Sequence, residues 1–483
     1  MDNHDTLTYL RKESLDIYNR LHSIEEDIVF VDQVQMTYPT FPFLPNLRCG
    51  AWYTNPEISA KIPAYFKSTD GHNNNWSFNL RRANLHLLPH ILESGGLILV
   101  DSTRSGKRIP DALSKTVPIW CTVINRAMLI LHPHLRENDG THGKQRWDTT
   151  LYTPPSTVSK VEHHEIEKRL DGWAKALAAS SFTLPTLTWP LRPVWITPAT
   201  STFPRLPSGT ELDGDTNREF FPIVCVSASK QIDQGVERRS SGFSYVQGSG
   251  DDHELWGMGL TPDVFWAHRQ QFLSADRTHL PDLVAQILST SRTKPAPVSD
   301  YETVSPIVKV QGRLLVGVIS DPPDVSTRIA IQDNLVYVIL TPSEDLIPPI
   351  DSDPSLVVPT CAGKKGQSHF LHKVLPPAVE FIKRHLRSGL NVCIVCETGR
   401  DLSVGVALVA LQLFFTDDGS FVPQDRDSND DVAISKSSIR TRLEWLIASR
   451  PQANPSRATL KRVNEYLLTS RLFAPVNIDT RHG

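Results

Sequence analysis

The sequence predicts an α/β fold, and three observations support this prediction. Segments rich in Val and Ile alternate with segments of helical period along most of the 483 residues. Several short apolar segments run directly into loops of Gly, Thr, Ser and Arg, which is typical of a parallel sheet with helices between its strands. The chain is also too long for one hydrophobic core, so we expect about two to four domains.

Composition and charge narrow the class of protein. Hydrophobic residues make up 40% of the chain and charged residues 21%, as in ordinary globular proteins. The net charge of −3 gives no general attraction to nucleic acids, so such binding must come from local basic patches. Six scattered cysteines without zinc-site spacing fit a reducing compartment. The N-terminus is unlike a signal peptide, and the longest apolar run, around Val404 to Phe415, is too short to cross a bilayer. We therefore expect a cytoplasmic protein with no membrane partner.

The stretch Ser291 to Asp300 is the best candidate for a domain boundary, because it is polar, contains two prolines and lacks an apolar period. It divides the chain into an N-terminal domain (1–290), a linker (291–300) and a C-terminal domain (301–483). In the C-terminal domain, 306–320 and 335–342 are predicted strands, and 372–389 is a predicted amphipathic helix that ends at its glycine. A strand, a polar loop and an apolar helix follow, so we expect a parallel sheet flanked by helices.

The loop CETGRDLS, which begins at Cys396, has most of the form of a phosphatase active site. Such phosphatases use a cysteine, five intervening residues and an arginine, but the arginine position is Leu402 here. The loop still directs backbone amides and a positive helix end toward one point, so we predict that it binds a phosphate without cleaving it. We expect Arg400 to supply charge, and Asp401 to order the loop or to meet a hydroxyl. The candidate residues are Cys396, Thr398, Gly399, Arg400, Asp401 and Ser403. A plain strand-to-helix turn with a buried cysteine is the alternative.

A second candidate loop follows the apolar segment LILV and begins at Asp101. Thr103 comes next, and the loop then carries three cations: Arg104, Lys107 and Arg108. We call this segment the basic loop. Cations beside small hydroxyl residues at the end of a strand suit a pyrophosphate or a nucleic-acid backbone. The spacing does not fit a Walker loop, and the single acid gives a partial likeness to the common phosphoribosyltransferase type. A solvated basic turn is the alternative.

The two loops have similar surroundings in the sequence. LHLLPHILESGGLILVDSTRSGKR and HKVLPPAVEFIKRHLRSGLNVCIVCETGR each read as a helix, a glycine stop, a short strand and a loop with Thr, Gly and Arg. Either an internal duplication or the order of helix, strand and loop that α/β units share explains this likeness.

An acidic cluster lies within FSYVQGSGDDHELWGMGLTP. Acidic clusters are usually solvated surface, but this one lies in a stretch rich in glycine and aromatic residues, which is poor surface composition. Carboxylates there could hold Mg²⁺ through waters, or accept the proton of a hydroxyl. The candidate metal ligands are Asp251, Asp252 and Glu254.

Two further stretches are candidates for contact with RNA. In AYFKSTDGHNNNWSFNLRR, the cations suit phosphates and the aromatic residues suit stacking on a base, whereas a lone histidine is more typical of a structural hydrogen bond. Its polar candidates, around Trp76, are Lys67, Asp70, His72, Arg81 and Arg82. Near the C-terminus, SRPQANPSRATLKRVNEYLL carries four cations, for which a solvated helix face is favoured over RNA contact: Arg450, Arg457, Lys461 and Arg462.

Together these stretches resemble one family, the fungal and plant initiator-tRNA 2′-O-ribosyl phosphate transferases. The similar blocks, in order along nearly the whole chain, are CGAWY, YFKSTDGH, VDSTRSGKRIPDALSKTVPIW, YVQGSGDDHELW and CETGRDLSVG. The resemblance implies a large N-terminal domain and a C-terminal domain similar to dual-specificity phosphatases. It also implies transfer of ribose 5-phosphate from 5-phosphoribosyl diphosphate to the 2′-hydroxyl of a T-stem adenosine in initiator tRNA. In that family the added phosphate keeps the initiator out of elongation, so the resemblance implies the same role here.

The resemblance gives the candidate residues roles in a transfer that releases pyrophosphate. We expect the cations of the loop after Asp101 to bind donor phosphates, with Mg²⁺ as cofactor. Asp251 and Asp252, with Asp70 as a further candidate, would serve Mg²⁺ or base catalysis. The partner is initiator methionine tRNA, not DNA, and its expected contacts are Lys67, His72, Trp76, Arg81, Arg82, Arg457 and Lys461. If the donor binds at the Cys396 loop instead, the basic loop becomes the tRNA clamp.

Two other functions remain open. A phosphatase-like phosphate-ester hydrolase would need an arginine from elsewhere in the fold to replace Leu402. A non-catalytic tRNA-binding protein would need no acids, so the acidic cluster argues against it.

Overall fold

The computed structural model describes residues 3–47, 49–68, 76–104, 106–136, 147–207, 219–233, 235–291, 304–319, 334–342, 355–361, 363–422 and 434–469. The chain forms two compact units: Met1–Ala179 with Thr183–Ala296, and Ser180–Phe182 with Pro297–Gly483. The predicted linker lies outside the described residues, except for Ser291 at the end of a helix.

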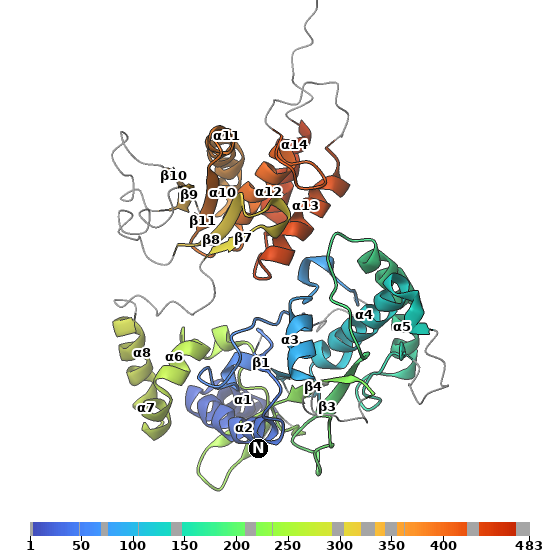
Figure 1. Ribbon diagram of the computed structural model, residues 1–483. Coiled ribbons are helices and arrows are strands. Elements are labelled where there is room, and N and C mark those ends of the chain that lie inside the picture. Colours follow the sequence, from blue (N-terminus) through green and yellow to red (C-terminus); the bar gives the residue numbers. More distant parts are fainter. Residues whose placement is uncertain are drawn as a thin grey trace, which may run out of the picture. The chain divides into compact units, whose positions relative to one another are not determined.

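The first unit combines a parallel sheet with helices (Figure 1). Its helices are α1 (Asn3–Leu15), α2 (Ile17–Thr37), α3 (Leu87–Ser94), α4 (Val117–Leu131), α5 (Lys160–Ala178), α6 (Pro262–Ala267), α7 (Arg269–Ser274) and α8 (Leu280–Ser291). Its strands are β1 (Phe43–Pro45), β2 (Leu97–Asp101), β3 (Leu191–Ile196), β4 (Phe221–Ser227), β5 (Val236–Arg238) and β6 (Ser244–Val246). The parallel sheet has the order β1-β2-β4-β3, and β5 pairs with β6 in an antiparallel ribbon.

The two central strands of this sheet, β2 and β4, are buried along their whole length. Continuous apolar sequences such as LILV and IVCV suit this position, because a parallel sheet is covered on both faces. α3 ends at Gly95, which has a left-handed backbone (φ 77°) and turns the chain into β2. The carboxyl ends of neighbouring parallel strands meet on one edge, so the residues after β1, β2 and β4 lie close together there.

The second unit is a five-stranded sheet with helices around it (Figure 1). Its strands are β7 (Val304–Pro306), β8 (Leu314–Val318), β9 (Leu335–Thr341), β10 (Ser355–Pro359) and β11 (Asn391–Cys396). Its helices are α10 (Gly363–His369), α11 (Leu375–Arg387), α12 (Leu402–Phe414), α13 (Lys436–Ser449) and α14 (Arg457–Thr469). The sheet order is β10-β9-β11-β8-β7, and only the edge strand β7 runs antiparallel among these described strands.

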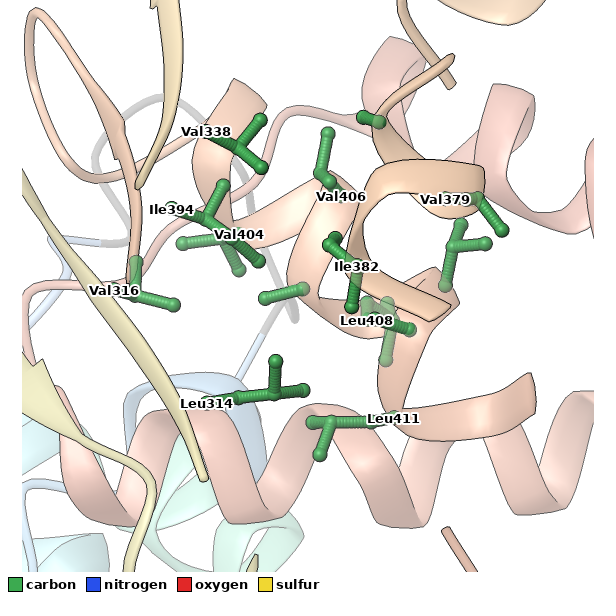
Figure 2. Close-up of a cluster of buried hydrophobic side chains, with 14 of the residues drawn as sticks. Leu314, Val316, Val338, Val379, Ile382, Ile394, Val404, Val406, Leu408 and Leu411 are labelled. Carbon is green, nitrogen blue, oxygen red and sulfur yellow. The ribbon is translucent and has the colours of Figure 1, made fainter. Parts of the chain in front are cut away.

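The core of the second unit lies between the sheet and helices α11 and α12. Figure 2 shows Val316, Val338 and Ile394 from three neighbouring strands beside Ile382 and Val404 from the helices. Helix α12 is apolar almost all round and is buried along most of its length, as the sequence LSVGVALVALQLF predicts.

The predicted α/β class and the parallel sheet flanked by helices are confirmed. The predicted strand at 306–320 is wrong in its extent, because a short 3-10 turn (Val308–Val310) and Gly312 in a left-handed conformation (φ 73°) separate β7 from β8. Apolar side chains alone could not reveal this turn. Among the helices of the described residues, none is long and apolar enough to cross a membrane.

Candidate functional site

The loop after β2 lies at the carboxyl edge of the first sheet, and side chains from other strands shape its start. Asp101 is fully buried and accepts hydrogen bonds from Asn46 Nδ2 (2.8 Å) and from the Ser102 amide (2.9 Å). Asn46 follows β1 and also binds the Phe66 backbone in both directions. Asp101 therefore joins two loops to each other, which is a supporting position, and its predicted contact with the substrate stays a prediction.

Thr103 and the three cations occupy the outer part of this loop. The Thr103 hydroxyl is buried, and no protein group hydrogen-bonds to it among the described residues. Such a buried hydroxyl is costly unless another group satisfies it, so it marks a place where a ligand oxygen could bind. Arg104 is largely exposed, Arg108 is half-buried, and Lys107 lies 3.2 Å from Asp111.

Gln247 holds the basic loop from a distant part of the chain. Its Nε2 donates to the carbonyl of Lys107 (2.7 Å) and to that of Arg104 (3.2 Å), and its Oε1 accepts from the Ile232 amide (3.1 Å). The next residue, Gly248, has φ 69°, and a Cβ there would lie 2.4 Å from the Thr103 carbonyl oxygen. Only glycine lets the backbone at residue 248 come so close to Thr103, and this contact brings the acidic segment after Gly248 against the basic loop.

The acidic turn is the segment from Gly248 to Glu254, and its three acidic residues differ in how far they are exposed to solvent. Asp251 is buried, and its backbone carbonyl accepts from the Trp256 indole N–H. Asp252 is half-exposed, has a left-handed backbone (φ 49°) and lies 4.0 Å from Arg104. Glu254 is exposed, so the three predicted metal ligands do not share one environment. Within the described ranges, no three His, Cys, Asp or Glu side chains converge as a metal site.

Arg20 of α2 supports the acidic turn from below. It donates to the Ser249 carbonyl (3.2 Å), and its guanidinium lies over the Trp256 ring. Burial lowers the pKa of Arg20, while the nearby Tyr53, Asp251 and Asp252 oppose that shift. Sequence reasoning missed this residue, because one arginine on a polar N-terminal helix has no local signal.

Asp27 of α2 lies at the centre of a second group that the sequence did not reveal. Its carboxyl oxygens lie 2.7 Å from the Tyr245 hydroxyl and 2.7 Å from Ser229 Oγ, and Ser229 Oγ lies 2.7 Å from Ser102 Oγ. The hydroxyl of Tyr53 accepts from the Gly250 amide (2.8 Å). All five side chains are buried. Burial raises the pKa of Asp27 to about 8, against the opposing effect of its hydrogen bonds.

The predicted RNA-contacting stretch is only partly described. Asp70 and His72 lie outside the described residues. Lys67 and Arg82 are exposed and Arg81 is half-buried, as contact with phosphates requires. Trp76 differs from the prediction: its ring is buried, its indole N–H donates to Glu162 (2.9 Å), and Arg169 covers one face. This ring is therefore covered where a stacking base would lie.

In the second unit, the loop after β11 has a buried thiol at its start. Cys396 Sγ lies 3.1 Å from Ser403 Oγ and 3.9 Å from Thr398 Oγ1. Leu402, in the position where phosphatases have arginine, is the first residue of α12 and packs against the core. Arg400 is exposed beside it. The loop thus keeps the cysteine and the helix end but lacks an arginine at the position that phosphatases use.

Arg450 holds this loop from behind. The side chain is buried, donates from Nε to the Gly399 carbonyl (2.8 Å) and from Nη1 to Ser305 Oγ (3.0 Å). Gly399 has φ 60°, and a Cβ there would lie 2.7 Å from the Gly317 carbonyl oxygen. Burial raises the pKa of the neighbouring Cys393 to about 12, and Arg450 opposes that shift. Sequence reasoning placed Arg450 among surface cations, because nothing local marks it as buried.

Asp401 orders the loop instead of facing solvent. Its Oδ1 accepts from the Ser456 amide (2.8 Å), and the Asn454 amide donates to the Arg400 carbonyl (2.9 Å). Ser456 precedes α14, so this contact brings the start of α14 to the loop. Arg457 and Lys461 are exposed on the first turns of α14. The structure thereby joins two candidates, the Cys396 loop and the C-terminal cations, that lie far apart in sequence.

The chain matches two family models and is similar in sequence to two fungal proteins. Residues 10–289 match the family described as the Rit1 N-terminal domain, and residues 355–467 match the Rit1 DUSP-like domain. A Saccharomyces cerevisiae protein named tRNA A64-2′-O-ribosylphosphate transferase is 34% identical over 498 aligned positions, covering 95% of this chain and 93% of that protein. An uncharacterized protein from Schizosaccharomyces pombe is 35% identical over 473 residues, covering 94% of this chain and 95% of that protein.

Solved structures of phosphatases also match part of the chain. Human DUSP28 matches 37% of this chain and 99% of its own, at 14% identity and a TM-score of 0.25. A mouse putative dual specificity phosphatase, solved with zinc tungstate, matches 37% of this chain and 95% of its own, at 14% identity and a TM-score of 0.25.

Proposed function

We propose, because this chain belongs to the Rit1 family, that it is a glycosyltransferase that adds a ribosyl phosphate group to the 2′-hydroxyl of an adenosine in tRNA. The acceptor is the initiator tRNA and the donor is 5-phosphoribosyl diphosphate. The observation that carries the proposal is the close approach of the basic loop after β2 to the acidic turn, at Gly248 and Gln247. Cations for a leaving diphosphate and carboxylates for a hydroxyl acceptor lie side by side there.

The reaction exchanges one bond at the anomeric carbon of the donor for another. The bond from C1 of the ribose to the diphosphate oxygen breaks, and its electron pair leaves with pyrophosphate. A new bond forms from C1 to the 2′-oxygen of the tRNA adenosine, whose proton passes to a base. Positive charge develops on the ribose and negative charge on the leaving group, so stabilisation of the diphosphate is the main task of the protein.

The basic loop is suited to the leaving diphosphate. Arg104 and Arg108 supply guanidinium groups that can bind two phosphate oxygens at once, and Lys107 adds a third charge. The unpartnered Thr103 hydroxyl supplies a donor that is already in place. Arg104 also lies near Asp252, so a phosphate bound there would lie beside the acidic turn.

Asp251 is the better candidate for the base, and Asp252 for contact with a metal. A buried carboxylate holds one position, which favours proton transfer from a hydroxyl within hydrogen-bond reach. Mg²⁺ usually binds substrate phosphates with one or two carboxylates, which fits the half-exposed Asp252 and needs no cage of three protein ligands. When bound, the ion would neutralise the leaving diphosphate.

The loop at Cys396 binds a phosphate that stays intact. Its amides, Arg400 and the nearby Arg457 supply positive charge, whereas the buried Arg450 is already engaged with protein oxygens. Phosphatase activity is therefore not expected. If this loop binds the donor diphosphate, the loop after β2 binds tRNA instead.

The test is release of pyrophosphate by the purified protein with 5-phosphoribosyl diphosphate and Mg²⁺, with initiator tRNA in one sample and elongator methionine tRNA in another. Release with the initiator alone supports both the reaction and its specificity. A protein that binds the tRNA but releases no pyrophosphate in either sample is a binding protein, and steady hydrolysis of p-nitrophenyl phosphate would favour a phosphatase.

Matched variants of the acidic turn test the roles within it. Asp251→Asn should lower transfer by about 10²–10⁴-fold, because a positioned base contributes that much. Glu254→Gln, on the exposed part of the same turn, should change transfer little. A folded Asp251→Asn protein with full activity would remove Asp251 from the reaction, and a large loss in Glu254→Gln would return Glu254 to the metal site.

A further inference from the structure

Asp27 lies beneath the basic loop and the acidic turn, and its side chain is linked to them through the hydroxyl groups of other residues. Its partners reach three separate segments: Ser229 follows β4, Tyr245 belongs to β6, and Ser102, bonded to Ser229, precedes the basic loop. Tyr53 extends the group, because it interacts with Ser102 and Ser229 and accepts from the Gly250 amide of the acidic turn. One carboxyl group therefore connects the basic loop to the acidic turn.

No cation forms an ion pair with Asp27 in the part of the chain that the structure describes. Tyr245, Tyr53 and Ser229 face it from the other elements, together with the Lys230 amide. Glu26 on its own helix adds negative charge, although Arg239 pairs with Glu26. A buried carboxylate without a cation is unfavourable, so the neutral carboxyl is favoured until the solution becomes alkaline.

The protonation state sets the direction of the hydrogen bonds. When Asp27 is ionised, Ser229 and Tyr245 both donate to it, and Ser102 is left to donate toward Ser229. When Asp27 is neutral, Oδ2 carries the proton and donates to Ser229, which donates to Ser102. The Ser102 proton is then available to the Tyr53 hydroxyl, where the chain of donors from Asp27 meets the Gly250 amide, which donates to the same oxygen.

We propose that Asp27 is a positioning residue for the transfer reaction, which acts as a neutral hydrogen-bond donor to hold the basic loop and the acidic turn in register. The inference rests on the proposed function. Ionisation reverses the Ser229 and Ser102 hydrogen bonds and places a negative charge below the site for an anionic donor. Binding of 5-phosphoribosyl diphosphate then weakens at alkaline pH.

The experiment compares Asp27→Asn with the wild-type protein in pyrophosphate release from pH 6 to 9. Asparagine keeps the shape of a neutral carboxyl, accepts from Tyr245 and donates to Ser229, but cannot ionise. The wild-type KM for the donor should rise above a pH of about 8, while Asp27→Asn should keep transfer at pH 7 and lack that alkaline rise. Asp27→Ala should lose about 10²-fold, because the loops are no longer held in register.

Asp32→Asn is the matched control, since Asp32 lies on the same helix, has a pKa that burial raises, and makes no contact with this group within the described residues. It should keep the wild-type alkaline rise. An alkaline rise that persists unchanged in Asp27→Asn, or a strong loss of activity in Asp27→Asn at pH 7, would overturn the inference.

Thermal melting gives a second readout that does not depend on activity. The pKa of Asp27 is higher in the folded protein than its ordinary value of 3.8, so the folded protein holds this proton more tightly. Its stabilising effect is complete below a pH of about 4 and is lost as the pH rises toward 8. Asp27→Asn should therefore melt increasingly above the wild-type protein between pH 5 and 8, and a constant difference contradicts a neutral Asp27. Absence of pyrophosphate release from the wild-type protein would overturn the proposed function, whereas these melting curves address Asp27 alone.

Discussion

The loop after β2 and the loop after β11 both follow a helix, a glycine and a buried strand, yet different forces shape them. In the first unit, Gln247 holds the basic loop from 140 residues further along the chain, and the acidic turn comes with it. In the second unit, Arg450 holds the Cys396 loop from 51 residues further along, and no acidic turn contacts that loop among the residues that the structure describes. The first arrangement suits a reaction between two groups, and the second suits binding of one anion.

Removal of the Arg450 side chain should give the largest difference in behaviour between the two loops. Arg450→Ala removes a buried cation together with its hydrogen bonds to the Gly399 carbonyl and Ser305 Oγ, and this loss destabilises the loop by about 3 kcal/mol. Amide hydrogen exchange in residues 398–401 should speed up by about 10²-fold, with no change in residues 101–104. Arg457→Ala, a nearby exposed arginine, serves as control. Unchanged exchange in Arg450→Ala would show that the loop holds its shape without this side chain.

The corresponding variant in the first unit is Gln247→Ala. Loss of its hydrogen bonds to the basic loop costs about 2 kcal/mol, which corresponds to about 30-fold in pyrophosphate release. Gln270→Ala, on the exposed surface of α7, should have no effect. If Gln247→Ala is fully active, the basic loop does not need this contact, and the contrast between the two loops disappears.

The cations of α14 should matter for RNA and not for chemistry. Lys461→Ala should weaken binding of initiator tRNA and reduce the slope of log affinity against log salt by about 1, because one phosphate contact is lost. Lys436→Ala on α13 is the matched control. A salt dependence equal to that of the wild-type protein would leave α14 as a solvated face, the alternative that the sequence also allowed.

The smallest effect is expected from Cys396→Ser. The thiol has no nucleophilic role in this proposal, and a hydroxyl can keep the contact with Ser403. Pyrophosphate release should stay close to the wild-type rate. Complete loss of transfer with the fold intact would show that the second loop performs covalent chemistry after all.

The sequence predicted what depends on neighbours in the chain. The run from α11 through β11 to α12 follows from a helical period, the glycine at 389 and continuous apolar segments, and the structure contains all of them. It could not predict Asp27, Arg450 or Gln247, because each acts on residues far away. Asp27 lies among other acids in IEEDIV, and only the fold distinguishes it from Glu25 and Glu26.

Strand order has a consequence for biosynthesis. In the first sheet β4 lies between β2 and β3, and in the second β11 lies between β8 and β9, although both strands come last among their described neighbours. A nascent chain therefore exposes the edge of β2 until residues 221–227 leave the ribosome, and that of β8 until residues 391–396 do. Each loop discussed above gains its final neighbours only after this late insertion. Truncated chains should thus be prone to aggregate and to depend on chaperones. A ribosome that stalls after residues 221–227 have emerged, but before residues 391–396 are made, would leave the first sheet complete and the second unfinished.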